Sequence, residues 1–175
     1  HKFSAWTTRV LERLGLPLYF SNNEGGAVFL DDDAPSKFTT QEIKEFFKGT
    51  VVLSAPCAKT LNEQGFLDYT GVNISDWDGK TVHYDLIDGH RVSPVTGLQR
   101  LTPINDSVEE LSHAVCRLPN DDVEKLGVSV SGYINPLGGY TVVYGGTPDT
   151  WWNYSTAFSL LCESRKNQFI KILKR

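Results

Sequence analysis

The chain has 175 residues, of which 40% are hydrophobic and 22% charged, and its formal net charge is −4 at pH 7. These values are those of an ordinary globular domain and exclude a disordered, collagen-like or coiled-coil protein. The negative charge argues against a nucleic-acid partner, and no apolar run is long enough for a membrane span. We therefore expect one domain over residues 1–175.

The first 72 residues alternate between helix and strand patterns. Apolar residues already have helical spacing in the opening segment, which suggests a piece excised from a longer chain. Strand and helix in alternation are typical of βαβ units with a parallel sheet. The expected elements are a helix at 3–14, a strand at 27–30, a helix capped by Thr39 or Thr40, a strand at 51–53 and a helix that ends at Gly65.

From residue 73 the pattern becomes one of antiparallel strands, and residues 73–127 are expected to be a β-rich insertion. Alternating residues on either side of Asp88-Gly89 predict a hairpin. The other expected elements are a strand at 114–118, one helical turn at 121–126, a hairpin of strands 128–134 and 140–144, and a last helix at about 155–173.

The stretch at residues 50–61 is a short apolar strand, a tight turn and a helix. Ligands and nucleophiles often lie just beyond the carboxyl end of such a strand, and Cys57 stands in this turn. A thiolate there is a candidate nucleophile, because a helix N-terminus favours the charged form. The alternative is a small apolar residue at a helix start, which is also how Cys116 and Cys162 are interpreted.

Three segments carry a resemblance to a known family. They are Gly49-Thr50-Val51-Val52-Leu53-Ser54, Ala58-Lys59-Thr60-Leu61-Asn62-Glu63-Gln64-Gly65-Phe66 and Tyr69-Thr70-Gly71-Val72. Their pattern resembles the class I glutamine amidotransferase-like domains attached to bacterial glycoside hydrolases, similar to the β-galactosidase trimerisation domain. Residues 139–146 and Arg165-Lys166-Asn167-Gln168 also fit this pattern.

The resemblance implies a fold class and a role. The fold would be α/β, a flavodoxin-like three-layer sandwich with a mostly parallel central sheet plus a β-hairpin excursion. The role would be that of a non-catalytic accessory or interface domain of a larger carbohydrate-active enzyme, with no cofactor. Its partners would be other domains of the parent chain, a second copy of itself or carbohydrate, and its compartment would be the bacterial periplasm or the exterior.

The chain departs from a working amidotransferase at the nucleophile. Such an enzyme needs a G-x-C-x-G elbow and a later His-x-Glu pair, whereas the sequence before Ala58 reads Leu53-Ser54-Ala55-Pro56-Cys57. None of the four histidines begins a His-x-Glu pair. The resemblance therefore implies the scaffold of a site, with a Cys57 hydrolase or amidotransferase-like activity as the alternative.

A second alternative is a phosphatase-like hydrolase that uses Mg²⁺. An apolar strand that ends in Asp31, Asp32 and Asp33, followed by a strand that ends in Ser54, resembles the haloacid-dehalogenase phosphatases. There Asp31 would be the nucleophile, and Asp31 and Asp33 would hold the metal. Pro35 replaces the Thr or Val of that family, and a solvated loop that caps the next helix explains the same acids.

The aromatic residues near the C-terminus form the remaining candidate site. Trp151, Trp152 and Tyr154 follow a Gly-Gly-Thr-Pro turn and could stack on sugar rings or on a neighbouring domain. Buried, they would close the core beneath the last helix together with Tyr144. The two histidines of the predicted 81–95 hairpin would need a third ligand to bind a metal.

Overall fold

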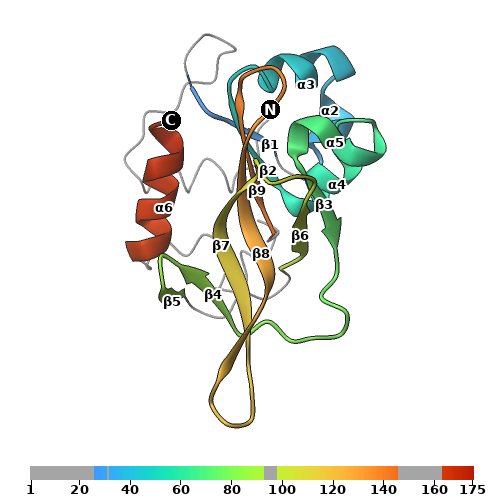
Figure 1. The fold of residues 1–175 in the computed structure, drawn as a ribbon. Helices are drawn as coiled ribbons and strands as arrows, with labels where there is room; N and C mark the ends of the chain where they lie inside the picture. Colours follow the sequence, from blue (N-terminus) through green and yellow to red (C-terminus); the bar gives the residue numbers. More distant parts are fainter. Residues whose placement is uncertain (1–25, 31, 93–97, 146–162) are drawn as a thin grey trace.

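The computed structural model describes residues 26–30, 32–92, 98–145 and 163–175, and it shows a mixed α/β domain with helices on both faces of a sheet (Figure 1). The helices are α2 (Ala34–Lys37), α3 (Thr40–Phe46), α4 (Ala55–Glu63), α5 (Leu67–Thr70) and α6 (Glu163–Leu173). The strands are β1 (Val28–Leu30), β2 (Thr50–Ser54), β3 (Val72–Ser75), β4 (Tyr84–Ile87), β5 (His90–Val92), β6 (Arg100–Pro103), β7 (Glu109–Arg117), β8 (Val123–Ile134) and β9 (Tyr140–Tyr144).

The described strands form a sheet that is mostly antiparallel. Its order is β1-β2-β9-β8-β7-β4-β5, and β3 joins it through β6, which pairs with β8. Only β1 with β2 and β2 with β9 are parallel pairs among these strands. The expected flavodoxin-like sandwich with a mostly parallel sheet is therefore wrong, although the sheet is partly parallel.

The reason lies in where the chain goes after α4. The prediction assumed that the next strand would return beside β2, but the second neighbour of β2 is β9, with Ser54 opposite Tyr144. Gly71 ends α5 with φ +76, and a Cβ at this position would lie 2.7 Å from the Tyr133 ring. The backbone there takes a left-handed turn that favours glycine, and β3 then pairs antiparallel with β6.

Several local predictions are confirmed. β4 and β5 form the hairpin around Asp88-Gly89, β7 contains the strand predicted near residue 114, and β8 and β9 form the hairpin around residues 135–139. The predicted helical turn at 121–126 is wrong, because β8 begins at Val123. The part of the last helix before Glu163 and the helix at 3–14 lie outside the described residues.

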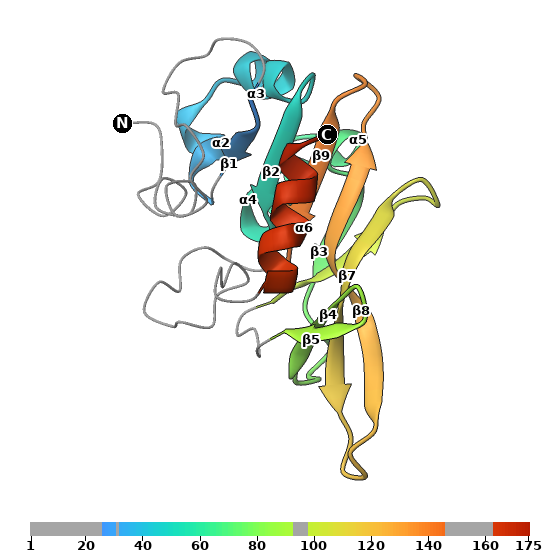
Figure 2. The same cartoon turned by 90° about the vertical axis from the view of Figure 1, so that its left-hand side faces the viewer.

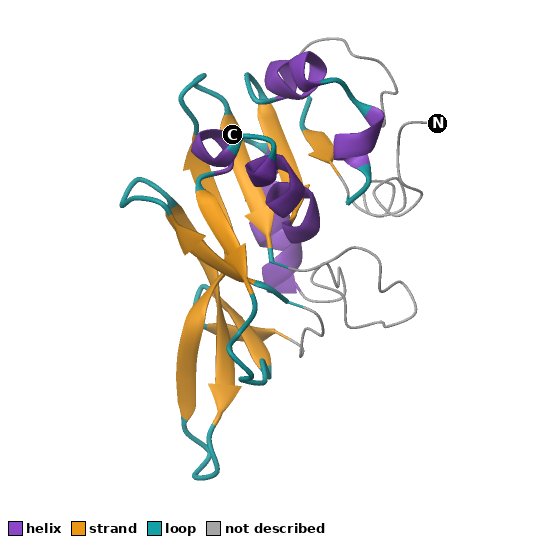
Figure 3. Ribbon diagram, turned by 90° about the vertical axis from the view of Figure 1, so that its right-hand side faces the viewer, coloured by secondary structure: helices purple, strands orange, loops and turns teal. Residues whose placement is uncertain are grey.

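Two apolar cores lie on opposite faces of the sheet. Figures 2 and 3 show α6 on one face of the β2–β9 region, with α4 and α5 on the other. The face covered by α4 and α5 buries residues such as Leu53, Leu61 and Phe66, whereas the face covered by α6 buries Val142, Phe169 and Ile172. Apolar burial on both faces fixes which side chains of β2 and β9 point to each helix layer.

Candidate functional site

The carboxyl end of the parallel strands β1 and β2 is the first candidate site. The candidate catalytic residues predicted from the sequence, Cys57 and the acids at 31–33, follow these two strands. β2 ends at Ser54, whose backbone is extended and whose hydroxyl caps α4 by accepting a hydrogen bond from the Cys57 N–H at 3.2 Å. Pro56 stands in the first turn of the helix, where its missing N–H costs nothing. Strand and helix thus follow in the order that the sequence predicts, but Cys57 lies in the first turn of α4 and not in a turn before the helix.

Cys57 is part of the core at the start of α4. Its relative exposure is 0%, and it packs in the apolar core beneath α4 and α5 together with residues such as Ala58 and Leu61. A nucleophile must contact its substrate, and a thiol enclosed by apolar side chains does not do so in this conformation. Here the residue acts as a small buried hydrophobe, and its backbone N–H supplies the bond to the cap.

Asp32 and Asp33, two of the three acids after β1, make different contacts. Asp31 lies outside the described residues. Asp32 accepts a hydrogen bond from the Ser54 hydroxyl at 2.5 Å, which joins the ends of the neighbouring strands β1 and β2. Asp33 precedes α2, and its carboxylate pairs with Lys37 one turn later. The acid that reaches Ser54 is thus Asp32, whereas the sequence reasoning chose Asp31 and Asp33.

A metal site would need several ligating side chains close together. Within residues 26–30, 32–92, 98–145 and 163–175, no group of three or more His, Cys, Asp or Glu side chains is arranged to hold a metal ion. His90 lies exposed on β5, and the His83 ring contacts the Thr81 carbonyl and the Arg117 N–H. The structure therefore does not bring these two histidines onto a shared ligand set.

The aromatic candidates are described only in part. Trp151, Trp152 and Tyr154 lie outside the described residues. Tyr144 is buried at the end of β9, with the Arg165 guanidinium carbon 5.7 Å from its ring centroid. Burial raises the pKa of the Tyr144 phenol, and the nearby Arg165 charge opposes this shift.

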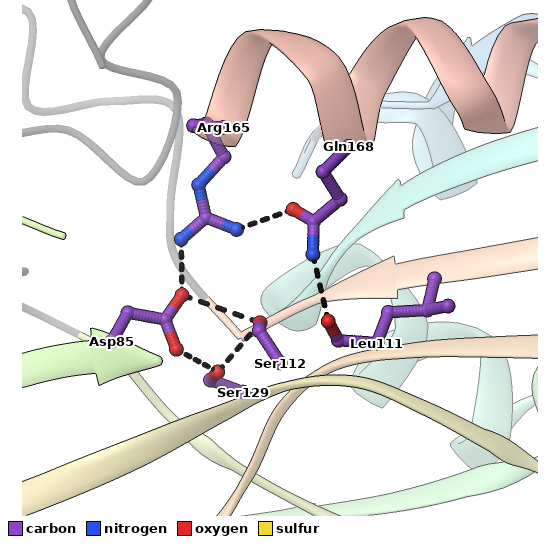
Figure 4. A network of polar contacts seen from close by, with 6 residues as sticks. All are labelled: Asp85, Leu111, Ser112, Ser129, Arg165 and Gln168. Atoms are coloured by element: carbon purple, nitrogen blue, oxygen red, sulfur yellow. Dashed lines mark hydrogen bonds and ion pairs between the residues drawn. The ribbon is translucent and has the colours of Figure 1, made fainter. Parts of the chain in front are cut away.

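A buried polar network between α6 and the sheet was not predicted (Figure 4). Asp85 on β4 accepts hydrogen bonds from Arg165 Nη2 on α6 and from the hydroxyls of Ser112 and Ser129. Arg165 also donates through Nη1 to Gln168 Oε1 at 2.6 Å, and Gln168 donates to the Leu111 carbonyl at 2.9 Å. The network neutralises a buried carboxylate and a buried guanidinium while it links α6 to β4, β7 and β8.

The sequence carried a signal for this network. Asp85 lies in phase with Ile87 on an alternating strand, so its side chain points to the same buried face. Arg165 and Gln168 have the helical spacing of Phe169 and Ile172, which places all four on the buried side of α6. A charge in phase with core residues on each element predicts a buried ion pair.

A second polar cluster lies near the end of α6. The Tyr140 hydroxyl donates to Glu109 Oε2 at 3.3 Å, Arg175 Nη1 donates to Glu109 Oε1 at 2.8 Å, and the Arg175 guanidinium carbon is 4.9 Å from the Tyr140 ring centroid. Burial, and then the Glu109 charge, raise the pKa of Tyr140 to about 12. The phenol is therefore protonated at neutral pH and serves as a hydrogen-bond donor.

Comparison of the chain with protein-family models, with curated proteins and with solved structures found no match. The findings thus support a mixed α/β domain with a partly parallel sheet and identify no family. Among the described helices, none has the length and apolarity needed to cross a membrane.

Proposed function

We propose that this chain is a non-catalytic accessory domain of a larger carbohydrate-active enzyme, of the amidotransferase-like kind that its motifs resemble. Cys57 carries the proposal: the residue at the expected nucleophile position is enclosed in the core with 0% exposure. The turn that would present a nucleophile instead supplies a helix cap. Other domains of the parent chain are the proposed partners.

The contacts of the neighbouring polar groups support the same role. The Ser54 hydroxyl both accepts from the Cys57 N–H and donates to Asp32, and the Asp33 carboxylate pairs with Lys37. The Ser54 hydroxyl caps α4 and joins it to Asp32, whereas the Asp33–Lys37 pair is exposed and lies within one helical turn. The hydrogen bond between Ser54 and Asp32 thus connects the carboxyl ends of β1 and β2.

The motifs of the resemblance lie on described elements of the fold. Residues 49–72 fall on β2, α4, α5 and the start of β3. Gly65 and Gly71 in these motifs have φ of +90 and +76, conformations that favour glycine. Backbone geometry therefore explains the glycines of these motifs. The proposal that the parent protein is a carbohydrate-active enzyme comes from the resemblance alone.

One specific contact favours a second candidate. The 2.5 Å hydrogen bond between Ser54 and Asp32 brings an acid of the Asp31–Asp33 run and a hydroxyl together at the ends of adjacent parallel strands. A Mg²⁺-dependent, phosphatase-like hydrolase would need such a meeting of acid and hydroxyl. In that case Asp32→Asn would abolish turnover of a phosphate ester.

The experiment measures kcat/KM for a panel of aryl glycosides with the polypeptide that contains this chain. The accessory role predicts turnover that changes by no more than about twofold in Cys57→Ala and Asp33→Asn. Asp106→Asn, at an exposed position in the β6–β7 turn, is the matched control. Loss of turnover in Cys57→Ala or Asp33→Asn, with the control unaffected, would contradict the proposal.

A further inference from the structure

The outer part of the β7–β8 hairpin extends away from the rest of the sheet, and we refer to residues 116–127 as the arm. Figure 1 shows its tip projecting beyond the neighbouring strands. β4 pairs with β7 only as far as Val115, and β6 pairs with β8 at Val128. Among the described strands, the arm therefore pairs only within β7 and β8. We call the residues where it joins the rest of the sheet, near Val115 and Val128, its root.

His83 lies at this root, directly before β4. Its backbone N–H donates to the Val115 carbonyl at 2.9 Å, which continues the contact with β7 beyond the start of β4. Its ring nitrogen Nδ1 lies 3.2 Å from the Arg117 N–H, which donates to it. The same Nδ1 lies 3.1 Å from the Thr81 carbonyl oxygen. One ring atom thus faces a donor on the arm and an acceptor in its own segment.

These two contacts require opposite protonation states. Nδ1 accepts from Arg117 only when it carries no proton, which leaves the proton of the neutral ring on Nε2. A protonated Nδ1 can donate to Thr81 but cannot accept from Arg117. Protonation of the ring therefore exchanges a hydrogen bond to the arm for one within residues 81–83.

The charges around the ring come from each element near it. Tyr84 on β4 has its ring centroid 6.4 Å from that of His83, and Arg117 on β7 pairs with Asp121 in the arm turn. Lys80, in the segment before β4, pairs with Glu124 on β8 at 2.6 Å. Arg117 and Lys80 are thus each paired with an acid, whereas Arg91 on β5 lies over the Tyr84 ring, with its guanidinium carbon 5.8 Å from the centroid.

We propose that His83 is a pH-sensitive latch for the arm. The neutral ring accepts from the Arg117 N–H, and the ring protonated at Nδ1 donates to Thr81 instead, which removes one hydrogen bond at the root of the arm. Histidine is the side chain whose charge ordinarily changes between about pH 5 and pH 8. The latch concerns the arm and holds independently of the proposed accessory function.

The test is hydrogen exchange of the Arg117 amide, measured by NMR at about pH 8 and about pH 5 and corrected for the intrinsic pH dependence. Loss of one hydrogen bond predicts protection that is about twofold to tenfold lower at the acidic pH. Equal protection at both pH values would overturn the latch. A long-range ¹H–¹⁵N spectrum at the higher pH must place the ring proton on Nε2, and a proton on Nδ1 would also overturn it.

Two variants isolate the ring. His83→Asn keeps an acceptor oxygen near the place of Nδ1 but carries no titrating proton, so the Arg117 amide should lose its pH dependence. His90→Asn, on the exposed strand β5, is the matched control and should keep the wild-type behaviour. Persistence of the pH dependence in His83→Asn, or its loss in His90→Asn, would overturn the proposal, and the ring spectrum tests the wild-type protein if a variant fails to fold.

Discussion

Arg165 on α6 and Asp85 on β4 form an ion pair across 80 residues of sequence, with 1% and 0% of their side chains exposed. The pair is the centre of the network that joins the C-terminal helix to the antiparallel part of the sheet (Figure 4). Two serine hydroxyls donate to the Asp85 carboxylate and the Gln168 side chain accepts from Arg165, so both charges make further hydrogen bonds within the network.

Removal of one partner should therefore be costly. Asp85→Ala leaves the Arg165 guanidinium buried without its counter-charge, and we expect the free energy of unfolding to fall by about 3–5 kcal/mol. The double variant Asp85→Leu with Arg165→Met should recover most of this loss. Urea unfolding measures each value.

The control for that experiment is an exposed pair between the same helix and the β4–β5 turn. Lys171 lies 3.3 Å from Asp88 with both side chains exposed. Lys171→Ala should change the free energy of unfolding by less than about 1 kcal/mol. An Asp85→Ala cost as small as that of Lys171→Ala would show that the buried network does not hold α6.

Gly139 is predicted to tolerate no side chain. A Cβ there would overlap the Phe47 carbonyl oxygen and lie 2.5 Å from that of Gly49, and both are backbone atoms. Gly139→Ala should lower the free energy of unfolding by about 1–3 kcal/mol, because the β8–β9 turn must move away from the α3–β2 turn. In Gly49→Ala the nearest atom is 3.9 Å away, so this variant should be close to neutral. Equal thermal stability of the two variants would refute the close approach.

The native thiols should differ in reactivity. Cys57 has 0% exposure, whereas Cys116 on β7 is half-buried. Iodoacetamide should label Cys116 at least about tenfold faster than Cys57, because the reagent reaches Cys57 only after local unfolding. Peptide mass mapping measures the two rates. Labelling of Cys57 in the native protein as fast as in urea would show an accessible thiol at the β2–α4 turn.

Tyr140 should titrate at unusually high pH. Burial and the Glu109 charge raise its pKa from 10.0 to about 12, so the folded state favours the protonated phenol. The stability due to this shift is complete below about pH 10 and is lost as the pH rises through about 12. The ultraviolet difference titration between wild type and Tyr140→Phe isolates its midpoint. In Glu109→Gln the midpoint should fall, and a wild-type midpoint near 10.0 would contradict the buried phenol.

The sequence predicts the elements whose signals are local. The helix start at Thr39 and the turn at residues 135–139 each depend on a few neighbouring residues. Strand and helix ends at these positions are therefore confirmed. Capping and turn geometry depend on neighbours in sequence and not on the fold as a whole.

Strand partners could not be predicted in the same way. The neighbour of β2 is β9, which lies more than eighty residues later, and the apolar pattern of β2 is the same whichever strand lies beside it. The pattern also treated Asp85 as one polar residue of an alternating strand. Its meaning depends on Arg165, whose position beside it is set by long-range packing.

Turnover by the protein itself tests the central claim most directly. The claim is that the β2–α4 turn is structural, and the substrates are L-glutamine and p-nitrophenyl phosphate with Mg²⁺. We predict no turnover of either substrate above the buffer rate in wild type, Cys57→Ala or Asp32→Asn. Turnover by wild type that disappears in Cys57→Ala for glutamine, or in Asp32→Asn for the phosphate ester, would contradict the claim.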